Sequence, residues 1–409
     1  MKYFHTLLCL FLSLSFVHSQ KVFPDKMYAL INAQIVDIES ETIKTGTVWI
    51  KNGIIENIDY QGIKVPDIYE IVDLEHSFLL PGMIDVHTHL NNLKAAKRAL
   101  MSGVTTVRSA SVPAFQDVSI SEMVVNGQLE GPDMIPCGVY VTPFLNENIL
   151  ADPRLGVLRG PVDEEGELRH LVKINIDRGA KVIKTRGTER AGLPETDPRK
   201  QTYTKEQLGW VVDEANKHNV PVIIHAHGDE GARAAVEAGA RSIEHGTFLS
   251  DETLMLMKEK DVFLVPTYIT LLDLTEPGGD YEHPVLEMRG KYMVPKSERT
   301  IKAAIRIGVK IATGADNRYA EKTTSRVSME VEEFRRLGME AWHALKTTTS
   351  LAAELLDINS STGQIKVGYE ADLIAIPDNP IEDTKALQDV VMVMSNGNMS
   401  LLRLPFGIK

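Results

Sequence analysis

Cysteine is almost missing from this chain, which has two among 409 residues, Cys9 and Cys137. Cys9 lies in an N-terminal stretch that we expect to be removed, so the mature chain could form no internal disulfide bond. Cys137 lies in an apolar run, and no base close to it in the sequence could activate its thiol. We therefore interpret Cys137 as a small buried hydrophobic residue and expect neither a disulfide scaffold nor a cysteine nucleophile.

The chain also lacks a block of basic residues. Lys and Arg together number 44 against 56 Asp and Glu, which gives a net charge of −12. Proteins that bind nucleic acids carry clustered positive charge, so we expect no nucleic-acid partner.

A long apolar run that could cross a bilayer is absent as well. The apolar stretch over residues 6–17 is shorter than the roughly 20 residues that a membrane-spanning helix needs. With Lys2 before it and Ser19 at its end, the stretch is typical of a secretory signal peptide over residues 1–19, and a membrane anchor is the alternative. We expect a secreted or periplasmic protein with no stable membrane insertion once the signal is removed.

Both ends of the remaining chain are rich in short predicted strands. Residues 20–77 contain runs of β-branched residues bounded by Asn, Asp and Gly, and residues 358–409 repeat this character. Two β-rich ends around one middle predict that both ends fold together as one small β-sandwich domain; two unrelated terminal extensions are the alternative. A chain of this length can hold such a domain beside a large barrel.

The middle of the chain, residues 78–357, alternates apolar strands with amphipathic helices, which is the α/β pattern of a parallel sheet. Gly103, Gly179, Gly239 and Gly308 each precede a predicted strand and would stop a helix. Eight strand candidates can be counted, at residues 83–89, 104–108, 134–140, 180–184, 220–225, 241–245, 262–266 and 309–313. Eight such units predict a (β/α)8 TIM barrel, whose chemistry lies at the C-terminal ends of its strands.

Polar residues fall at that end of several predicted strands. Asp85, His87 and His89 alternate along the first strand, so their side chains share one face. Two imidazoles at this spacing can bind one metal ion, whereas a pair of ordinary strand-end histidines is the alternative. The other strand ends carry Lys184, His225, His245 and Asp316. The set as a whole predicts a metal site.

The motifs around these residues resemble those of the amidohydrolase superfamily, in particular its imidazolonepropionase-like and prolidase-like dipeptidase members. The first motif is Leu80-Pro-Gly-Met-Ile-Asp-Val-His-Thr-His, and the later ones are Gly103-Val-Thr-Thr-Val-Arg, Ile224-His-Ala-His-Gly, Ser242-Ile-Glu-His-Gly and Thr313-Gly-Ala-Asp. The resemblance covers nearly the whole mature chain. It is specific for the family and much less specific for the substrate.

The resemblance implies a site for two divalent metal ions, with zinc as the expected metal. Lys184 would bridge the two ions, although a plain ammonium group has no lone pair to offer. In the family this lysine reacts with carbon dioxide to give a carbamate, which binds one metal through each oxygen as a carboxylate would. A salt-bridged barrel lysine is the alternative. The other implied ligands are His87 and His89 for one ion, with Asp316 beside it, and His225 and His245 for the second.

The chemistry that this implies is hydrolysis of an amide C–N bond, in a dipeptide or an N-acyl amino acid. The two ions would activate a water molecule, and Asp316 would take its proton and pass it to the leaving amine. One alternative is ring opening of a cyclic amide, as in imidazolonepropionase; those relatives usually use one metal and lack the bridging lysine, so Lys184 favours the dipeptidase branch. The other alternative is a catalytically inactive metal-containing binding protein, against which Asp316 argues.

Substrate binding is expected in the long strand-to-helix loops at residues 141–165, 185–204 and 267–296. The resemblance would lead us to expect a Gly-Gly pair after Lys184, but the chain has Thr185-Arg-Gly-Thr-Glu-Arg there. Arg186, with Arg190, could clamp an acidic group of the substrate, or both could be solvated loop charges. We also expect the protein to be able to form a homo-oligomer.

Two further residues are candidates for substrate contacts. His225 directly follows an apolar run and is the expected metal ligand, which leaves His227 for the substrate, although spacing alone does not decide between them. Tyr140 would end the third strand beside the site, where related dipeptidases hold the substrate carboxylate with a tyrosine. A packing tyrosine at the top of the barrel is the alternative.

Overall fold

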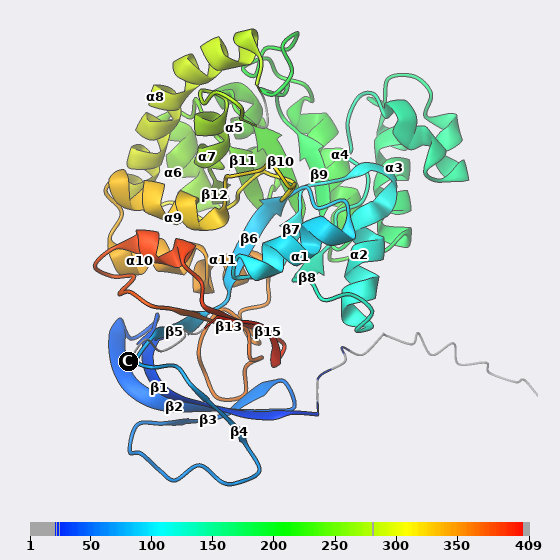
Figure 1. Ribbon diagram of the computed structural model, residues 1–409. Coiled ribbons are helices and arrows are strands. Elements are labelled where there is room, and N and C mark those ends of the chain that lie inside the picture. The colour runs from blue at the N-terminus through cyan, green and yellow to red at the C-terminus, as the bar shows by residue number, and fades with distance from the viewer. Residues whose placement is uncertain (1–20, 22, 24, 280–281, 404–409) are drawn as a thin grey trace, which may run out of the picture.

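The computed structural model describes residues 21, 23, 25–279 and 282–403, so the predicted signal peptide over residues 1–19 lies outside the described residues. An α/β body of parallel strands and surrounding helices adjoins a β-rich base (Figure 1). None of the described helices has the length and apolar character needed to span a membrane.

The base is one eight-stranded sheet to which both ends of the chain contribute. β5 (Phe78–Pro81) pairs in parallel with β1 (Met27–Asp37) and antiparallel with β13 (Leu373–Ile376), so it joins the N-terminal strands to the C-terminal ones. The strand order is β15-β14-β13-β5-β1-β2-β3, and β4 pairs with β1. The remaining strands are β2 (Thr42–Lys51), β3 (Ile54–Asp59), β4 (Glu70–Asp73), β14 (Met392–Ser395) and β15 (Asn398–Leu402).

The middle of the chain forms two parallel sheets. One has the order β6-β7-β8 and the other the order β12-β11-β10-β9. Their strands are β6 (Met83–Thr88), β7 (Val104–Ser109), β8 (Asp133–Ile135), β9 (Ile183–Arg186), β10 (Val222–Ala226), β11 (Ser242–His245) and β12 (Phe263–Val265). Seven of the eight predicted strands are therefore present as regular strands, with shifted ends.

Backbone hydrogen bonds connect the two parallel sheets between β8 and β9. The amide of Lys181 donates to the carbonyl of Pro136 (2.7 Å), and the amide of Val141 donates to the carbonyl of Lys184 (2.9 Å). The strand predicted over residues 134–140 is regular only as far as Ile135. The residues that follow it still form backbone hydrogen bonds with the segment around β9.

The eighth predicted strand, residues 309–313, does not form a regular strand. An isolated parallel bridge joins Ile311 to Leu264 of β12, and the amide of Val86 in β6 donates to the carbonyl of Thr313 (3.0 Å). The segment then passes very close to β6, since a Cβ at Gly314 would lie 2.5 Å from the Cβ of His87. Its bonds are divided between β12 and β6, so no continuous ladder forms with either.

Helices cover the parallel sheets on the outside, and their ends carry the expected signals. Thr204 and Gln207 form a capping box at the start of α4. Gly239 (φ 99°) and Gly308 (φ 84°) end α5 and α8 in the left-handed conformation that glycine adopts without strain. The helices are α1 (Leu93–Met101), α2 (Gln116–Val125), α3 (Glu165–Asp177), α4 (Lys205–Asn216), α5 (Asp229–Ala238), α6 (Asp251–Glu259), α7 (Tyr268–Asp273), α8 (Pro284–Ile307), α9 (Val327–Arg336), α10 (Ala341–Thr347) and α11 (Ser350–Leu355). Four short 3-10 helices complete the described structure: Pro113–Phe115, Asn146–Leu150, Pro153–Val157 and Thr384–Gln388.

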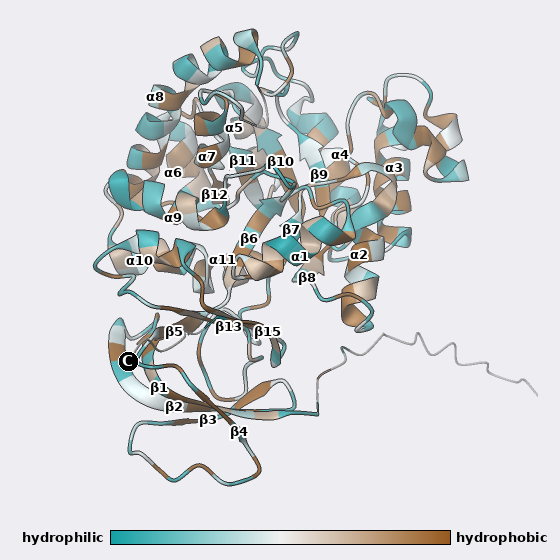
Figure 2. Cartoon of the chain, viewed as in Figure 1, coloured by the Kyte–Doolittle hydropathy of each residue, from teal (hydrophilic) through white to brown (hydrophobic). Residues whose placement is uncertain are grey.

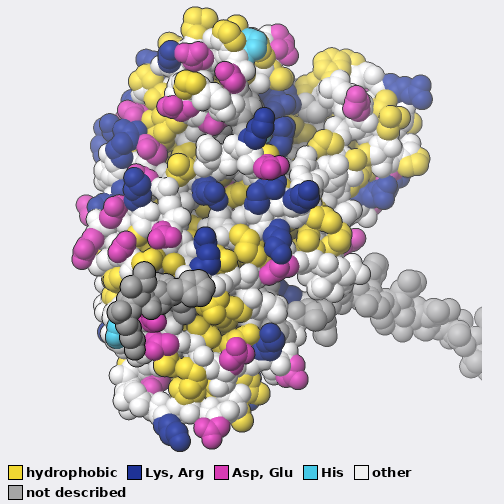
Figure 3. Space-filling model, viewed as in Figure 1, with side chains coloured by type: hydrophobic (Ala, Val, Ile, Leu, Met, Phe, Trp, Pro, Cys, Tyr) yellow, Lys and Arg dark blue, Asp and Glu magenta, His cyan; other side chains and the backbone are white. Residues whose placement is uncertain are grey.

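The largest apolar core lies between the parallel strands and their helices, and a second cluster lies in the base. Figure 2 shows strongly hydrophobic residues in the strands of the base and mixed polarity on the outer helices. On the face drawn in Figure 3, Lys and Arg side chains are interspersed with Asp and Glu. The strands are thereby fixed by burial, and the polar residues at their ends are held at defined positions.

Candidate metal centre

The polar residues predicted at the strand ends meet in one cavity of about 290 Å³. The imidazole of His245, at the end of β11, is the centre of this group. Its ring centroid lies 4.6 Å from the centroids of both His225 and His227, and 5.2 Å from that of His87. The cavity is lined by His87, His89, Lys184, His225, His227, His245 and Asp316, among others.

Two groups of possible metal ligands share His245. Donor atoms of His225, His227 and His245 lie within 4.8 Å of one another, and so do those of His87, His245 and Asp316. His227 thus lies as near to this centre as His225, and the assignment of His225 as the ligand stays a prediction.

Asp316 lies on the segment that follows the irregular eighth strand. Its Oδ1 is 3.1 Å from Nε2 of His89 and 3.4 Å from Nε2 of His87, and its Oδ2 is 3.9 Å from Nδ1 of His245. Burial alone would raise the pKa of this carboxyl, but His87, with the other two histidines, holds it well below its usual range. Asp316 is therefore an ionised carboxylate at neutral pH.

Four histidines in the cavity hold one ring nitrogen against a backbone carbonyl or a threonine hydroxyl, and Nε2 of His89 also lies 3.1 Å from Asp316. His89 Nδ1 bonds to the carbonyl of Ser111 (2.6 Å), His225 Nε2 to that of Glu189 (3.0 Å), His245 Nδ1 to Oγ1 of Thr267 (2.7 Å) and His227 Nδ1 to Oγ1 of Thr247 (2.8 Å). Partners of this kind fix a ring and leave its second nitrogen for a metal ion. Burial also lowers the pKa of the His89, His225, His227 and His245 imidazoles, to about 3 for His227, and so favours the neutral form that binds metals.

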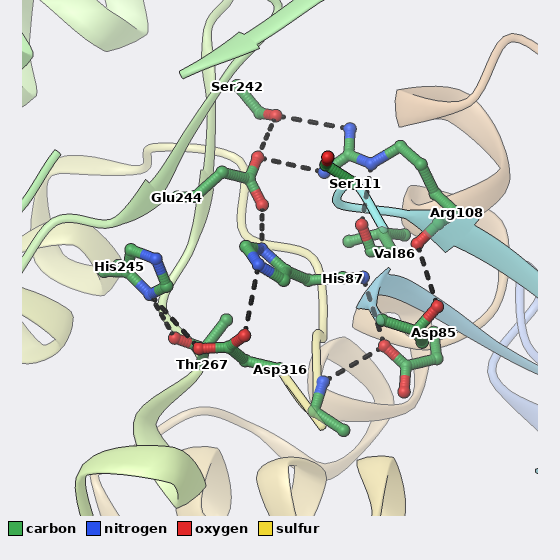
Figure 4. Close-up of polar contacts among 12 residues, drawn as sticks. Asp85, Val86, His87, Arg108, Ser111, Ser242, Glu244, His245, Thr267 and Asp316 are labelled. Atoms are coloured by element: carbon green, nitrogen blue, oxygen red, sulfur yellow. Dashed lines mark hydrogen bonds and ion pairs between the residues drawn. The ribbon is translucent and has the colours of Figure 1, made fainter. Parts of the chain in front are cut away.

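The orienting partner of His87 is Glu244, a residue that sequence reasoning did not select. Its carboxylate lies between Nδ1 of His87 and the guanidinium of Arg108, whose Nη2 donates to Oε1 at 2.9 Å (Figure 4). Both Glu244 and Arg108 are fully buried. Burial would raise the pKa of Glu244, but Arg108 and His87 hold it well below its usual range.

Glu244 was overlooked because neighbours in a regular strand point to opposite faces. Glu244 and His245 could not both face the site unless the regular strand conformation ended between them. His245, the last residue of β11, has a left-handed backbone with φ at 76°, and its ring lies in the cavity. The signal in the sequence was an acidic residue next to a strand-end histidine inside an apolar strand.

Asp85 ties the two segments that carry the site to each other. Its Oδ1 accepts hydrogen bonds from the amides of His87 (3.1 Å) and Ala315 (3.0 Å), and its Oδ2 accepts one from the hydroxyl of Tyr319 (2.8 Å). Burial raises the pKa of Asp85 to about 6 against these bonds. The carboxylate thus positions His87 through its own amide, and Asp316 through the amide of its neighbour Ala315.

Lys184 has a buried amine that lacks a hydrogen-bond partner among the described residues. The residue lies on β9, is 2 % exposed and lines the cavity. Burial lowers the pKa of the amine to about 8, against the attraction of Glu244 and Asp316. A buried polar atom without a partner is costly, so this amine is a position at which an additional group would be stabilising.

The predicted substrate residues divide into two groups. Tyr140 and His227 line the cavity, and the hydroxyl of Tyr140 has no partner among the described residues. Arg186 does not line it; its guanidinium carbon lies 4.6 Å from the centroid of the Tyr140 ring, over the ring face. The arginines that do line the cavity are Arg190 and Arg318, and sequence reasoning missed Arg318.

Comparison with known proteins identifies the class to which this site belongs. Residues 78–399 match the model of the amidohydrolase family, and the chain belongs to this family. The predicted family membership is therefore confirmed, and the chain is a metal-dependent hydrolase that acts on carbon–nitrogen bonds.

Individual relatives show which members are similar. Ochratoxinase from Aspergillus niger is 28% identical over 352 residues, which cover 76% of this chain and 72% of the relative. Imidazolonepropionase from Kosmotoga olearia is 22% identical over 395 residues, 86% of this chain and 89% of the relative. Among solved structures, an Xaa-Pro dipeptidase with bound methionine in its active site superposes with a TM-score of 0.83 at 26% identity, over 91% of this chain and 99% of that chain.

Proposed function

We propose that this protein is a binuclear metal-dependent amidohydrolase that cleaves the amide bond of a dipeptide or an N-acyl amino acid. The observation that carries the proposal is Lys184, because its buried amine has no protein partner although it lines the cavity of the histidines. With a pKa of about 8, well below that of an exposed lysine, this amine has a far larger neutral fraction at neutral pH than an ordinary lysine, and the neutral form can react with carbon dioxide. A carbamate on Lys184 would give the amine's position two metal-binding oxygens.

The donor set fits two divalent ions, for which zinc is our proposal. Imidazole nitrogens and carboxylate oxygens are ligands that zinc prefers. Ions bound here would lower the pKa of a water molecule enough for attack at neutral pH and would polarise the substrate carbonyl. His87, His89 and Asp316 would hold one ion, His225 and His245 the other, and carbamylated Lys184 both.

The protein's own groups would handle the proton and the substrate. Asp316 is ionised and within reach of three imidazoles, so it can accept the proton of the attacking water and deliver it to the leaving amine. The unpartnered hydroxyl of Tyr140 and the free ring nitrogen of His227 face the same cavity and would bind the substrate carboxylate or carbonyl oxygen. Arg190 at the cavity wall would add a cationic partner for a carboxylate.

The similarity to a dipeptidase supports the substrate class. This chain superposes on nearly the whole length of the Xaa-Pro dipeptidase. The structure of that dipeptidase holds an amino acid in its active site. A free amino acid is the carboxyl-terminal product when a dipeptide or an N-acyl amino acid is hydrolysed. The arginines that line this cavity suit the carboxylate of such a product. Bridging by Lys184 favours this class over the ring-opening reaction.

We further propose that the parallel strands close into a (β/α)8 barrel over residues 78–357. The backbone bonds on both sides of the two parallel sheets support closure. The base over residues 20–77 and 358–409 would be a β-sandwich, since one apolar cluster combines side chains of β1, β2, β13 and β14. Secretion or periplasmic export through residues 1–19 and a homo-oligomeric state are proposals from the sequence.

A library of dipeptides and N-acyl amino acids tests the function, with metal-loaded protein and the Asp316→Asn variant as control. Metal content per chain is measured on the same samples by plasma mass spectrometry. Two ions with turnover of library members that the control lacks is the expected result. One ion with hydrolysis of cyclic amides alone would replace the proposal by the ring-opening reaction, and binding of metal without any turnover would make the protein a binding protein.

A further inference from the structure

One wall of the cavity is a loop with no regular ladder to hold it. Arg190, Ala191 and Gly192 line the cavity, and residues 190–196 lie in neither a helix nor a strand. Within this loop, the hydroxyl of Thr196 donates to the carbonyls of Arg190 (2.5 Å) and Leu193 (2.8 Å). These bonds shape the loop but do not attach it to the rest of the protein.

In the part of the chain that the structure describes, the hydrogen bonds that attach this loop come from one guanidinium group, almost a hundred residues further along the chain. Arg289 on α8 donates through Nη1 to the carbonyls of Ala191 (2.5 Å) and Leu193 (2.7 Å), and through Nη2 to those of Pro194 (3.1 Å) and Thr196 (2.6 Å). The two terminal nitrogens carry four N–H groups, so the loop carbonyls use all of them. Four bonds from one planar group leave little freedom to the backbone that accepts them.

Close packing between α7 and α8 places Arg289 over the loop. A Cβ at Gly290 would lie 2.8 Å from the Cβ of Leu274, so only glycine lets the two helices approach this closely. Leu271 of α7 and Leu274, which follows that helix, line the cavity and form an apolar cluster with Ala191 of the loop. The loop is therefore held between this apolar cluster and the guanidinium.

We propose that Arg289 is a positioning residue that fixes the 190–196 wall and thereby sets affinity for the substrate. It has no place in the lining of the cavity and acts through Arg190, Ala191 and Gly192. A lysine could not replace it, since a single ammonium nitrogen cannot reach four carbonyls distributed along six residues. The link to substrate affinity rests on the proposed function, whereas the link to loop order does not.

Hydrogen–deuterium exchange on the full-length metal-loaded protein tests the loop without any substrate. In Arg289→Lys and Arg289→Ala, amides of peptides that span residues 190–197 should exchange about tenfold faster, which corresponds to the loss of one or two net hydrogen bonds. Arg299→Lys is the matched control, because Arg299 lies on the same helix and donates to the carbonyl of Leu249 instead. Free guanidinium at millimolar concentration should restore protection in Arg289→Ala.

Kinetics with a substrate identified by the library then tests the second link. Arg289→Lys should raise KM by about tenfold while kcat stays within about twofold, because the histidines and Asp316 keep their contacts. Unchanged exchange in Arg289→Lys, or an equal rise in the Arg299 control, would overturn the positioning role. Arg289→Lys keeps the charge and the alkyl stem and decides the question if Arg289→Ala does not fold. Exchange is informative even if no substrate is found, so the two proposals fail separately.

Discussion

The floor and the wall of the cavity are built by different means. The floor consists of His87, His89, Lys184, His225, His245 and Asp316, most of which are at or beside the ends of hydrogen-bonded strands; for example, Lys184 pairs with Ile223 and His245 with Ala226. The wall, residues 190–196, has no such ladder and is held by the Arg289 guanidinium and by the apolar contacts of Ala191. The residues for which we propose a role in the reaction are thus fixed by backbone pairing, whereas the loop that we propose to contact the substrate is fixed by side chains. Changes in one region should leave the other intact.

The largest effect should come from Asp316→Asn in the floor. Asn has a similar shape but cannot accept the proton, so kcat should fall by about 10³-fold. The metal content of the variant should stay close to that of the wild type, because the histidines remain. Rate measurements with metal analysis on the same preparations check this, and turnover within tenfold of the wild type would remove Asp316 from proton transfer.

Lys184→Ala should reduce activity by about 100-fold, on the scale of a lost metal-positioning ligand. Added acetate or propionate should restore part of the activity, since a carboxylate could occupy the space of the carbamate. Addition of chloride at the same ionic strength is the control. Full activity without added carboxylate would rule out a bridging role for Lys184.

Glu244→Gln should lower metal affinity by about tenfold, because the carboxylate that orients the His87 ring is replaced by an uncharged and weaker acceptor. The same variant leaves the fully buried Arg108 without its charged partner and should destabilise the protein by about 3–5 kcal/mol. The double variant Glu244→Gln, Arg108→Met separates the two effects. It should regain part of the stability in thermal unfolding but none of the metal affinity in chelator competition; recovery of both would show that Glu244 acts on the fold alone.

Much of the floor could be predicted from the sequence because apolar strands ending in polar residues mark it. The structure brings His87, His89, Lys184, His225, His245 and Asp316 into one cavity, as strand periodicity and the family motifs together indicate. The α/β class was equally accessible, since strands and helices alternate with clear stop signals. The sequence predicts a regular eighth strand, which the structure lacks, because the close approach of Gly314 to His87 depends on tertiary packing.

The wall could not be predicted in the same way, because the contacts of residues 190–196 follow neither the two-residue repeat of a strand nor the 3.6-residue repeat of a helix. Arg186 is a candidate from the sequence because it closely follows Lys184. In the structure its guanidinium lies over the ring of Tyr140, and the arginines that line the cavity are Arg190 and Arg318. Arg289 lies far from the loop in sequence, and nothing in its own neighbourhood indicates a contact with residues 191–196. Side-chain-to-carbonyl contacts of this kind follow from the folded geometry alone.

The smallest predicted effect is a pH dependence of the stability of the protein, and it arises where α9 contacts the start of α7. Glu330 on α9 accepts hydrogen bonds from the amides of Tyr268 and Ile269 (2.9 Å each) at the start of α7. Burial raises its pKa from an ordinary 4.5 to about 8, against the effect of those bonds. Between these two values the unfolded chain has released the proton while the folded protein keeps it, so stability falls as pH rises, by up to about 1.4 kcal/mol per pH unit.

Glu330→Gln cannot titrate and should flatten this dependence. Unfolding curves in urea at pH 5.5, 6.5 and 7.5 should therefore show the wild type losing stability relative to Glu330→Gln, and parallel curves would place this proton elsewhere in the protein.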